Sequence, residues 1–352
     1  MFSTKEYLYN LVTGKIKGFL GVFLRGCLFV FSLFYGVIVV ILASLYRIKP
    51  TRFNAKVISV GNITLGGTGK TTLVEYLSVK LSLAGKKIAV LSRGYKRDSR
   101  RPGAQGLGDE PAMLQKNLPL VQVVVDQNRI KAAQTAIDYA CDTLILDDGL
   151  QQWKIFKDLE IVTIDAQNPF GNYRMLPAGF LREPLFALKR ADIFVLTQVY
   201  SGQNLGDLTA KLKRINSRAL IIESRHEPKG VSRLDQADEL LDPEFLRGKP
   251  VAIFSGIGNP EGFQNCICGL GIKVAKYFRF PDHHDYTQAD ILRIIKEAKE
   301  NNLEEIITTQ KDAVKIRELG VKGTGILVLE IKLSITKNEA EFNRRLLKLY
   351  SF

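Results

Sequence analysis

Short apolar runs alternate with segments of helical periodicity along most of the chain after residue 47. Compact runs rich in Val, Ile and Leu predict buried strands, and the intervening segments predict amphipathic helices, for example at 73–83 and 128–140. The predicted strands are residues 57–60, 88–91, 121–125, 143–146, 161–164, 193–196, 220–222, 251–254, 273–278, 306–308 and 326–329. This alternation is typical of a parallel sheet (α/β/α) covered by helices, so we predict an α/β fold.

The rhythm of strands and helices breaks once, where Pro228, Gly230 and Pro243 interrupt it. We therefore predict a linker at 226–249. It separates a first α/β domain at 47–225 from a second, smaller α/β domain at 250–352, which includes a basic amphipathic helix from about residue 337.

The segment before the first strand has a different pattern. From Gly26 to Tyr46 no charged residue occurs over 21 positions, which at helical rise is about 30 Å, the thickness of a bilayer core. Basic residues flank both ends, so their distribution does not choose an orientation, and the run is too long for a cleaved signal peptide. Three interpretations of residues 1–46 stay open: a membrane-associated helix that spans the bilayer, one that lies in the interface, or a buried core helix.

The chain is strongly basic, with a net charge of +14 and a pI near 9.5. Nucleic-acid binders and proteins that face anionic membranes share such a surplus. Beside an apolar segment of membrane length, we interpret it as contact with an anionic membrane surface and expect no nucleic-acid partner. The four cysteines are too scattered for a disulfide framework, which indicates a reducing, cytosolic compartment.

A glycine-rich loop follows the first predicted strand and precedes a predicted helix, the context of a phosphate-binding loop. Its residues are Gly66, Gly67, Thr68, Gly69, Lys70, Thr71 and Thr72. In such a loop the backbone N–H groups surround phosphate oxygens, the lysine reaches the β- and γ-phosphates, and the first threonine binds Mg²⁺. Thr64 stands where the usual pattern has its first glycine. The alternative is a glycine turn without a ligand, but the Gly-Lys-Thr-Thr sequence favours ATP and Mg²⁺.

Two acids, Asp147 and Asp148, follow the apolar run 144–146. A carboxylate at the end of a strand is the Walker-B arrangement, in which it lies near the Mg²⁺ held by the loop threonine. Two acids after a strand are often only a turn, but together with the glycine loop they predict a metal site formed by Thr71, Asp147 and Asp148.

Other candidate residues leave their function open. Asp109 begins a predicted helix, either as a cap or as a carboxylate directed at the phosphates. His283 and His284 occupy a predicted loop, which suits a solvated loop, an acid–base role or a zinc site that lacks a further nearby Cys or His. Loops with Arg93 and with Arg182 and Glu183 suit an anionic substrate, although solvated basic loops look the same.

In these residues the chain resembles the tetraacyldisaccharide 4′-kinase family, the lipid A kinases of Gram-negative bacteria. The matching motifs run in the family's order over residues 57–62, 66–71, 91–95, 108–111, 146–151, 176–179, 181–184, 254–258, 280–283 and 308–312. Phosphate loops are common, but this ensemble is specific.

The resemblance implies a phosphate-loop kinase domain at 47–225 and an active site in a cleft between two α/β domains. The donor would be ATP with Mg²⁺, and the acceptor the 4′-hydroxyl of a tetraacylated glucosamine disaccharide 1-phosphate, a lipid A precursor. The catalytic residues would be Lys70 and Asp109, the latter partnered by His283. Candidates for holding the substrate are Arg93, Arg182 and Glu183. The family's membrane-associated helix implies the cytoplasmic face of the inner membrane, with no obligate protein partner evident.

Two departures from the family pattern limit this transfer. Gln152 stands where the family has a histidine after Asp-Asp-Gly-Leu-Gln, and the segment 97–108 is shorter than in many members. The alternative enzyme is a membrane-attached phosphate-loop ATPase that acts as a conformational switch, and the non-enzymatic alternative is a membrane-anchored nucleotide-binding scaffold. Neither explains the Asp109 and His283 motifs.

Overall fold

The computed structural model of the chain describes residues 4–94, 108–200, 202–236, 239–321 and 324–351, except for the side chains of residues 4–6 and of Asp109. The chain forms two compact units. Unit 1 consists of Met1–Lys70, Ala133–Ser224 and Ile335–Phe352, and unit 2 of Thr71–Ala132 and Arg225–Ser334. The sequence-based division into domains at 47–225 and 250–352 stays a prediction.

The helices and strands have the following bounds. The α-helices are α1 (Thr4–Val12), α2 (Phe19–Ile48), α3 (Lys70–Leu83), α4 (Asp109–Asn117), α5 (Arg129–Asp138), α6 (Gly206–Ile215), α7 (Pro260–Gly269), α8 (Gln288–Glu300), α9 (Gln310–Glu318) and α10 (Glu339–Lys348). The strands are β1 (Lys56–Asn62), β2 (Ile88–Ser92), β3 (Gln122–Val125), β4 (Thr143–Asp147), β5 (Leu159–Asp165), β6 (Ile193–Thr197), β7 (Leu220–Arg233), β8 (Leu240–Leu241), β9 (Pro250–Ser255), β10 (Lys273–Arg279), β11 (Ile306–Thr309) and β12 (Ile326–Lys337). The described residues also contain the short 3₁₀ helices η2 (Leu185–Arg190) and η3 (Pro243–Leu246).

Each predicted strand coincides with an observed one, and the predicted α/β class with a mostly parallel sheet is confirmed. The main difference lies in β7 and β12, which extend far beyond the predicted runs 220–222 and 326–329. The extension of β7 is largely polar and carried no strand signal, whereas that of β12 alternates Ile331, Leu333 and Ile335 with polar residues, a strand pattern that the prediction did not use. The segment 226–249 contains the second half of β7, β8 and η3.

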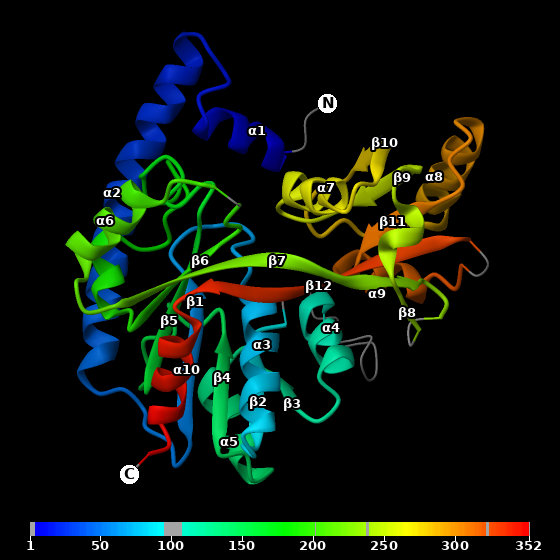
Figure 1. Ribbon diagram of the computed structural model, residues 1–352. Helices are drawn as coiled ribbons and strands as arrows, with labels where there is room; N and C mark the ends of the chain where they lie inside the picture. Colours follow the sequence, from blue (N-terminus) through cyan, green and yellow to red (C-terminus); the bar gives the residue numbers. More distant parts are fainter. Residues whose placement is uncertain (1–3, 95–107, 201, 237–238, 322–323, 352) are drawn as a thin grey trace. The chain divides into compact units, whose positions relative to one another are not determined.

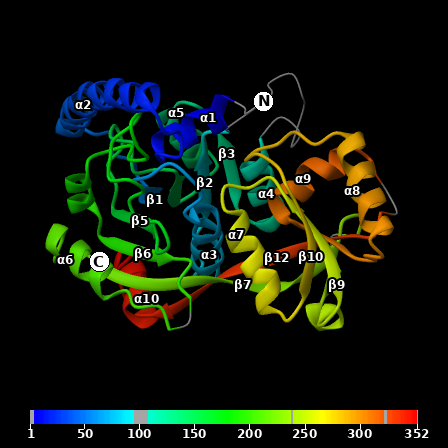
Figure 2. The same ribbon diagram turned by 90° about the horizontal axis from the view of Figure 1, so that it is seen from above.

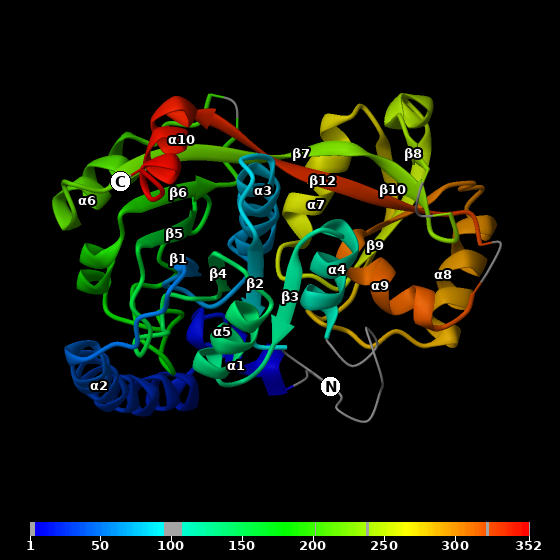
Figure 3. The same cartoon turned by 90° about the horizontal axis from the view of Figure 1, so that it is seen from below.

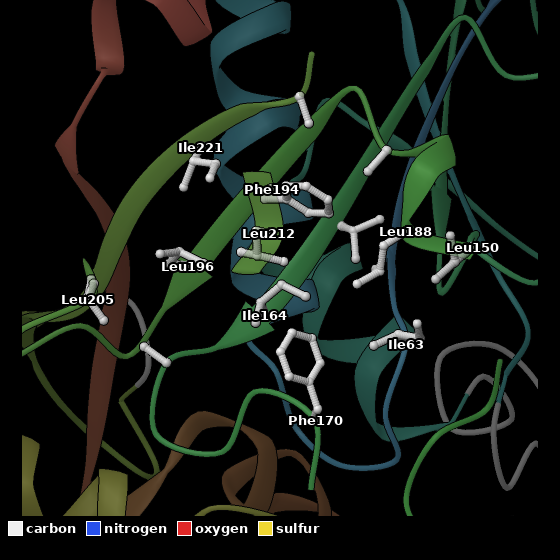
Figure 4. Packing of buried hydrophobic residues seen from close by; sticks show 14 of the residues in the cluster. Ile63, Leu150, Ile164, Phe170, Leu188, Phe194, Leu196, Leu205, Leu212 and Ile221 are labelled. Atoms are coloured by element: carbon white, nitrogen blue, oxygen red, sulfur yellow. The ribbon is translucent and has the colours of Figure 1, made fainter. Parts of the chain in front are cut away.

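Unit 1 is built on parallel strands in the order β7–β6–β5–β1–β4. Every residue of β4 and β6 is buried, as expected for strands covered on both faces. One core cluster joins β5 and β6 to α6 and η2, with Phe194, Leu196 and Leu212 packed together (Figure 4). This packing holds β5 and β6, the two strands that flank β1 on one side of the sheet.

Unit 2 has its own parallel strands in the order β10–β9–β11–β12. Ala252 and Phe254 of β9 belong to a core cluster with α8 and α9, whereas Val251 and Ile253 belong to a cluster with α7. Because successive residues of a strand point to opposite faces, helices cover both sides of this sheet, which Figure 2 shows. The strands β2 and β3 also pair in parallel within this unit.

Helix α2 is a 30-residue apolar helix on the outside of unit 1 (Figure 1, Figure 3), and only Gly21, Ser32, Val39 and Ala43 of it are buried. The hydroxyl of Tyr35 donates to the carbonyl oxygen of Arg182 at 3.1 Å, and the guanidinium of Arg174 lies over the ring of Phe29. Only 17% of its most apolar 18-residue window is buried. This exposure argues against the buried core helix and leaves the two membrane-associated interpretations.

Helix α10 packs onto unit 1 through Phe342 and Leu346, which are both fully buried. Polar contacts add to this packing, since the hydroxyls of Tyr350 and Thr143 are 2.8 Å apart. The residues 335–352 are therefore part of the folded unit that contains the glycine loop.

We expect Phe194→Ala to destabilise the protein by about 3–5 kcal/mol, because it removes a fully buried ring from the cluster of Figure 4 and leaves a cavity. The matched control is Phe186→Ala, which removes a ring that is 56% exposed. Chemical denaturation measures both. Equal losses in the two variants would contradict the assignment of this cluster as the core of unit 1.

Candidate functional site

The glycine loop connects β1 to α3, which begins at Lys70. Gly66 and Gly69 have φ angles of +117° and +74°, in the region that favours glycine. Thr68 is buried between them, and its hydroxyl lies 2.7 Å from that of Thr163 on β5. The hydroxyl of Thr197 on β6 donates to the carbonyl oxygen of Thr68 at 3.0 Å. Side chains from two strand ends therefore fix the shape of the loop.

The ammonium group of Lys70 has two partners in unit 1. It donates a hydrogen bond to Oδ1 of Asn62 at 3.1 Å, and it lies 3.6 Å from Oδ1 of Asp148. Asn62 is the last residue of β1, and its own amide nitrogen donates to the carbonyl oxygen of Thr64. The lysine is thus held beside the loop by a side chain that the sequence analysis did not identify.

The predicted acids lie at the carboxyl end of β4. Asp147 is its last residue, is buried, and stands in register with Val60 of β1. Asp148 follows with a left-handed φ of +58°, and Nη1 of Arg182 donates to both of its carboxylate oxygens at 2.8 Å. Burial works to raise the pKa of Asp148, but the charges of Lys70 and Arg182 outweigh it and hold the pKa below its ordinary value.

Glu183 is engaged by other protein groups. Its carboxylate is buried and accepts two hydrogen bonds of 2.8 Å from the guanidinium of Arg190. The amide of Gln151 and the indole N–H of Trp153 also donate to it, at 3.2 and 3.4 Å. The structure therefore gives Glu183 a role in holding residues 151–153. Its predicted contact with a substrate stays a prediction.

Thr71 and Thr72 lie in the first turn of α3. The hydroxyl of Thr72 lies 2.9 Å from Nε2 of His226 on β7. Burial lowers the pKa of His226 to about 4, so this imidazole is neutral near pH 7. His226 is the first of the three histidines in the chain, and the sequence analysis assigned it to the predicted linker and gave it no role.

A second group of predicted residues lies within unit 2. Asp109 is the first residue of α4, and its side chain lies outside the described part of the chain. His283 occupies the loop after β10 with a φ of +60°. Between these elements lies Lys311 of α9, whose Nζ is 3.4 Å from Oε1 of Glu110 and 3.2 Å from Nε2 of His283.

Lys311 determines the hydrogen-bonding state of His283. Burial works to lower the pKa of Lys311, but the carboxylates of Glu110 and Asp282 raise it above its ordinary value. A charged ammonium is a donor only, so in this contact Nε2 of His283 would be the acceptor. Lys311 belongs to the motif 308–312, which the sequence analysis quoted without giving it a role.

His284 is placed differently from its neighbour. Its ring stacks on Phe280 with centroids 4.6 Å apart, and its Nε2 lies 3.3 Å from Oδ2 of Asp290 at the start of α8. These contacts are internal to the loop and the helix cap, and they explain its presence without a catalytic role.

The remaining candidate is Arg93, which follows β2 and is exposed. Among the residues that the structure describes, no group of three or more His, Cys, Asp or Glu side chains is arranged to hold a metal ion. A phosphate loop needs fewer, because Mg²⁺ there takes one or two carboxylates together with phosphate oxygens and waters. The geometry of the loop thus suits a phosphate group, and the acid–base pair of Asp109 and His283 stays a prediction.

The chain was compared with known proteins. It matches the family described as tetraacyldisaccharide-1-P 4′-kinase over residues 24–351. A tetraacyldisaccharide 4′-kinase of Syntrophus aciditrophicus is 35% identical over 344 residues, covering 91% of each chain. One of Halothermothrix orenii is 33% identical and covers 94% of each chain.

A solved structure supports the same relationship. The crystal structure of the "apo" form of LpxK from Aquifex aeolicus in complex with ATP has a TM-score of 0.72 and 29% sequence identity. The match covers 93% of this chain and 100% of that one. The chain therefore belongs to the tetraacyldisaccharide 4′-kinase family.

Proposed function

We propose that the chain transfers the γ-phosphate of ATP to the 4′-hydroxyl of a tetraacylated glucosamine disaccharide 1-phosphate, which gives the 4′-phosphorylated lipid A precursor. Membership of the kinase family, together with the likeness to a relative solved with ATP, carries this proposal. The glycine loop with Lys70 held beside Asp148 supports it at the level of residues.

The nucleotide side of the reaction uses charge neutralisation and positioning. In a phosphate loop, backbone N–H groups and the lysine surround the β- and γ-phosphates. Here Lys70 has that position, since it begins α3 directly after Gly69. The negative phosphates would compete with Asp148 for its ammonium group.

Thr71, Asp147 and Asp148 would hold Mg²⁺. A hydroxyl and ionised carboxylates are hard oxygen ligands of the kind that Mg²⁺ takes, and the low pKa of Asp148 keeps its carboxylate charged. The ion, when bound, supplies positive charge that stabilises the negative charge on the transferring phosphoryl group.

The acceptor side uses the residues of unit 2. Asp109 would accept or orient the proton of the sugar hydroxyl, with His283 as its partner. Since Lys311 occupies Nε2 of His283, the other ring nitrogen, Nδ1, would be the one that faces a carboxylate. Arg93 and Arg182 remain our candidates for the anionic 1-phosphate, and Glu183 for the disaccharide.

The membrane side involves α2, whose exposed face carries large apolar side chains such as Phe31, Phe34 and Leu45. We propose that this face is inserted at the cytoplasmic side of the inner membrane, where ATP and a lipid acceptor meet. The basic surplus of the chain would contact anionic headgroups.

A single assay tests the proposed function. ATP labelled in the γ-phosphate is incubated with the full chain and the lipid acceptor in detergent micelles, and label is followed in lipid and in free phosphate. A kinase labels the lipid. Label only in free phosphate would replace this proposal with the ATPase switch, and label in neither would replace it with the scaffold.

We expect Lys70→Ala and Thr71→Ala each to lower kcat/KM several hundredfold, because a lost transition-state charge partner costs about 3–4 kcal/mol. Thermal unfolding should change little, since neither side chain belongs to the core. The control is Lys87→Ala, which removes an exposed lysine before β2. Near-normal turnover by either loop variant would reject the phosphate-loop assignment.

We expect Asp109→Ala and His283→Ala each to lower kcat by about 10²–10⁴-fold, the range of general acid–base catalysis, with a smaller change in KM for ATP. The double variant should be little worse than the more damaged single variant, because residues that share one step are non-additive. His284→Ala, which removes a ring stacked on Phe280, is the control with a small expected effect. Fully additive losses would separate Asp109 from His283.

We expect the full chain to resist extraction from membranes by high salt, because salt screens charge attraction but not apolar burial. Phe31→Asp with Phe34→Asp should move the folded protein towards the soluble fraction, since both rings lie on the exposed face of α2. Leu83→Asp alters an apolar residue at the end of α3 that is even more exposed, and it serves as the control. Release of the unchanged chain by salt alone would contradict membrane insertion.

A further inference from the structure

A buried ion pair contacts the turn that follows β4. Nζ of Lys157 is 2.6 Å from Oε2 of Glu160, and their side chains are only 9% and 8% exposed. Burial lowers the pKa of Lys157 and raises that of Glu160, while the attraction between the two opposes both shifts. Because desolvation makes such a pair poor at stabilising a fold, its presence calls for another role.

The ammonium group of Lys157 provides that role. Besides Glu160, it donates to the carbonyl oxygen of Gly149 at 2.6 Å and to that of Leu150 at 3.2 Å. An ammonium has three protons, so these three partners use all of them. Two consecutive carbonyl groups directly after Asp148 are thus fixed by one buried point charge.

The backbone around this turn is closely packed against β1. A Cβ atom added at Gly149 would collide with the side chain of Ser59 on β1, and one added at Gly61 would collide with the backbone of Leu150. Asp148 itself has a left-handed φ of +58°, which surrounding contacts must maintain.

A second positively charged side chain, that of Arg190, contacts the same turn. Nη2 of Arg190 lies 3.4 Å from the carbonyl oxygen of Leu150 and also binds Glu183. Glu183 in turn accepts from the side chains of Gln151 and Trp153. The backbone after Asp148 is therefore held through its carbonyl groups and through its next side chains.

We propose that Lys157 is a positioning residue for phosphoryl transfer, because its ammonium group fixes the carbonyl groups of Gly149 and Leu150 and so orients the carboxylate of Asp148 towards Mg²⁺·ATP. This inference rests on the proposed nucleotide site. The alternative is that the pair of Lys157 and Glu160 only stabilises the fold.

The test separates charge pairing from carbonyl binding. Lys157→Met alone would leave the carboxylate of Glu160 buried without a partner, so the principal variant is Lys157→Met with Glu160→Met, which removes both charges and retains apolar volume. Its matched control is Glu160→Gln, which removes the carboxylate charge but keeps an amide oxygen that accepts from Lys157, so that the ammonium group stays bound to both carbonyl groups. Thermal unfolding establishes that each variant is folded.

The first readout is the Mg²⁺ dependence of transfer. In the double variant the Mg²⁺ concentration for half-maximal rate should rise by about 10- to 100-fold, the usual effect of removing a group that orients a metal ligand, with a smaller change in kcat at saturating Mg²⁺. Glu160→Gln should stay close to the unchanged chain. A purely structural role would lower the melting temperature and leave the Mg²⁺ dependence unchanged.

The second readout needs no lipid and no turnover. Trp153 is the only tryptophan of the chain, and it lies in the same turn with its N–H directed at Glu183. Its fluorescence, titrated with Mg²⁺ at a fixed concentration of a non-hydrolysable ATP analogue, should report the same rightward shift in the double variant. Because this titration contains no acceptor, failure of the proposed lipid transfer would not affect it.

Superimposable Mg²⁺ titrations of the folded double variant and the unchanged chain would overturn the inference. If the double variant does not fold, Lys157→Arg replaces it, because a guanidinium keeps the charge but cannot place one nitrogen between Glu160 and both carbonyl groups. The same rise in the Mg²⁺ requirement is then expected, and an unchanged requirement would overturn the inference in this case too.

Discussion

Parallel pairing of β1 with β4 and β5 is the constraint on which the nucleotide site depends. Strands of a parallel sheet end at one edge, so the register of Val60 with Asp147 brings the acids to the start of the glycine loop. The register of Asn62 with Thr163 likewise places the threonine that meets Thr68. A shift of one residue in either pair would turn these side chains to the opposite face, so that the loop and the acids would no longer meet.

Each cationic side chain of the site that the structure pairs is neutralised by a nearby carboxylate. Lys70 faces Asp148, Arg190 faces Glu183, and Lys311 faces Glu110 and Asp282. These cations are therefore held in place before any ligand arrives. A nucleotide phosphate competes with a carboxylate that is already present, which limits the gain from binding but reduces the cost of ordering long side chains.

The sequence predicted the parts of this molecule that depend on local pattern. Buried parallel strands are continuous apolar runs, so β4 and β6 could be placed almost to the residue, and the glycine loop is a contiguous motif. The extension of β7 was not predictable, because its polar residues pair with β12 only after distant segments meet, whereas the alternation of apolar and polar residues did mark the extension of β12. The partner of His226 likewise comes from a distant part of the chain. The partners of Lys157 are close to it in the sequence, but a sequence does not reveal which charges will be buried. Glu183 illustrates the limit, since its motif marks it but not its pairing with Arg190.

The placement of α10 has a consequence for biosynthesis. Unit 1 contains both Met1–Lys70 and Ile335–Phe352, and Phe342 and Leu346 of α10 fill its interior. On the ribosome, β1 and the glycine loop emerge long before the residues that complete their unit. The apolar α2 leaves the exit tunnel earlier still, so it can reach the membrane while the catalytic part is unfinished. If α2 is inserted as proposed, the nascent chain would fold at the bilayer surface, and the unit that contains the glycine loop would be complete only after residue 335 and the segment following it had been translated.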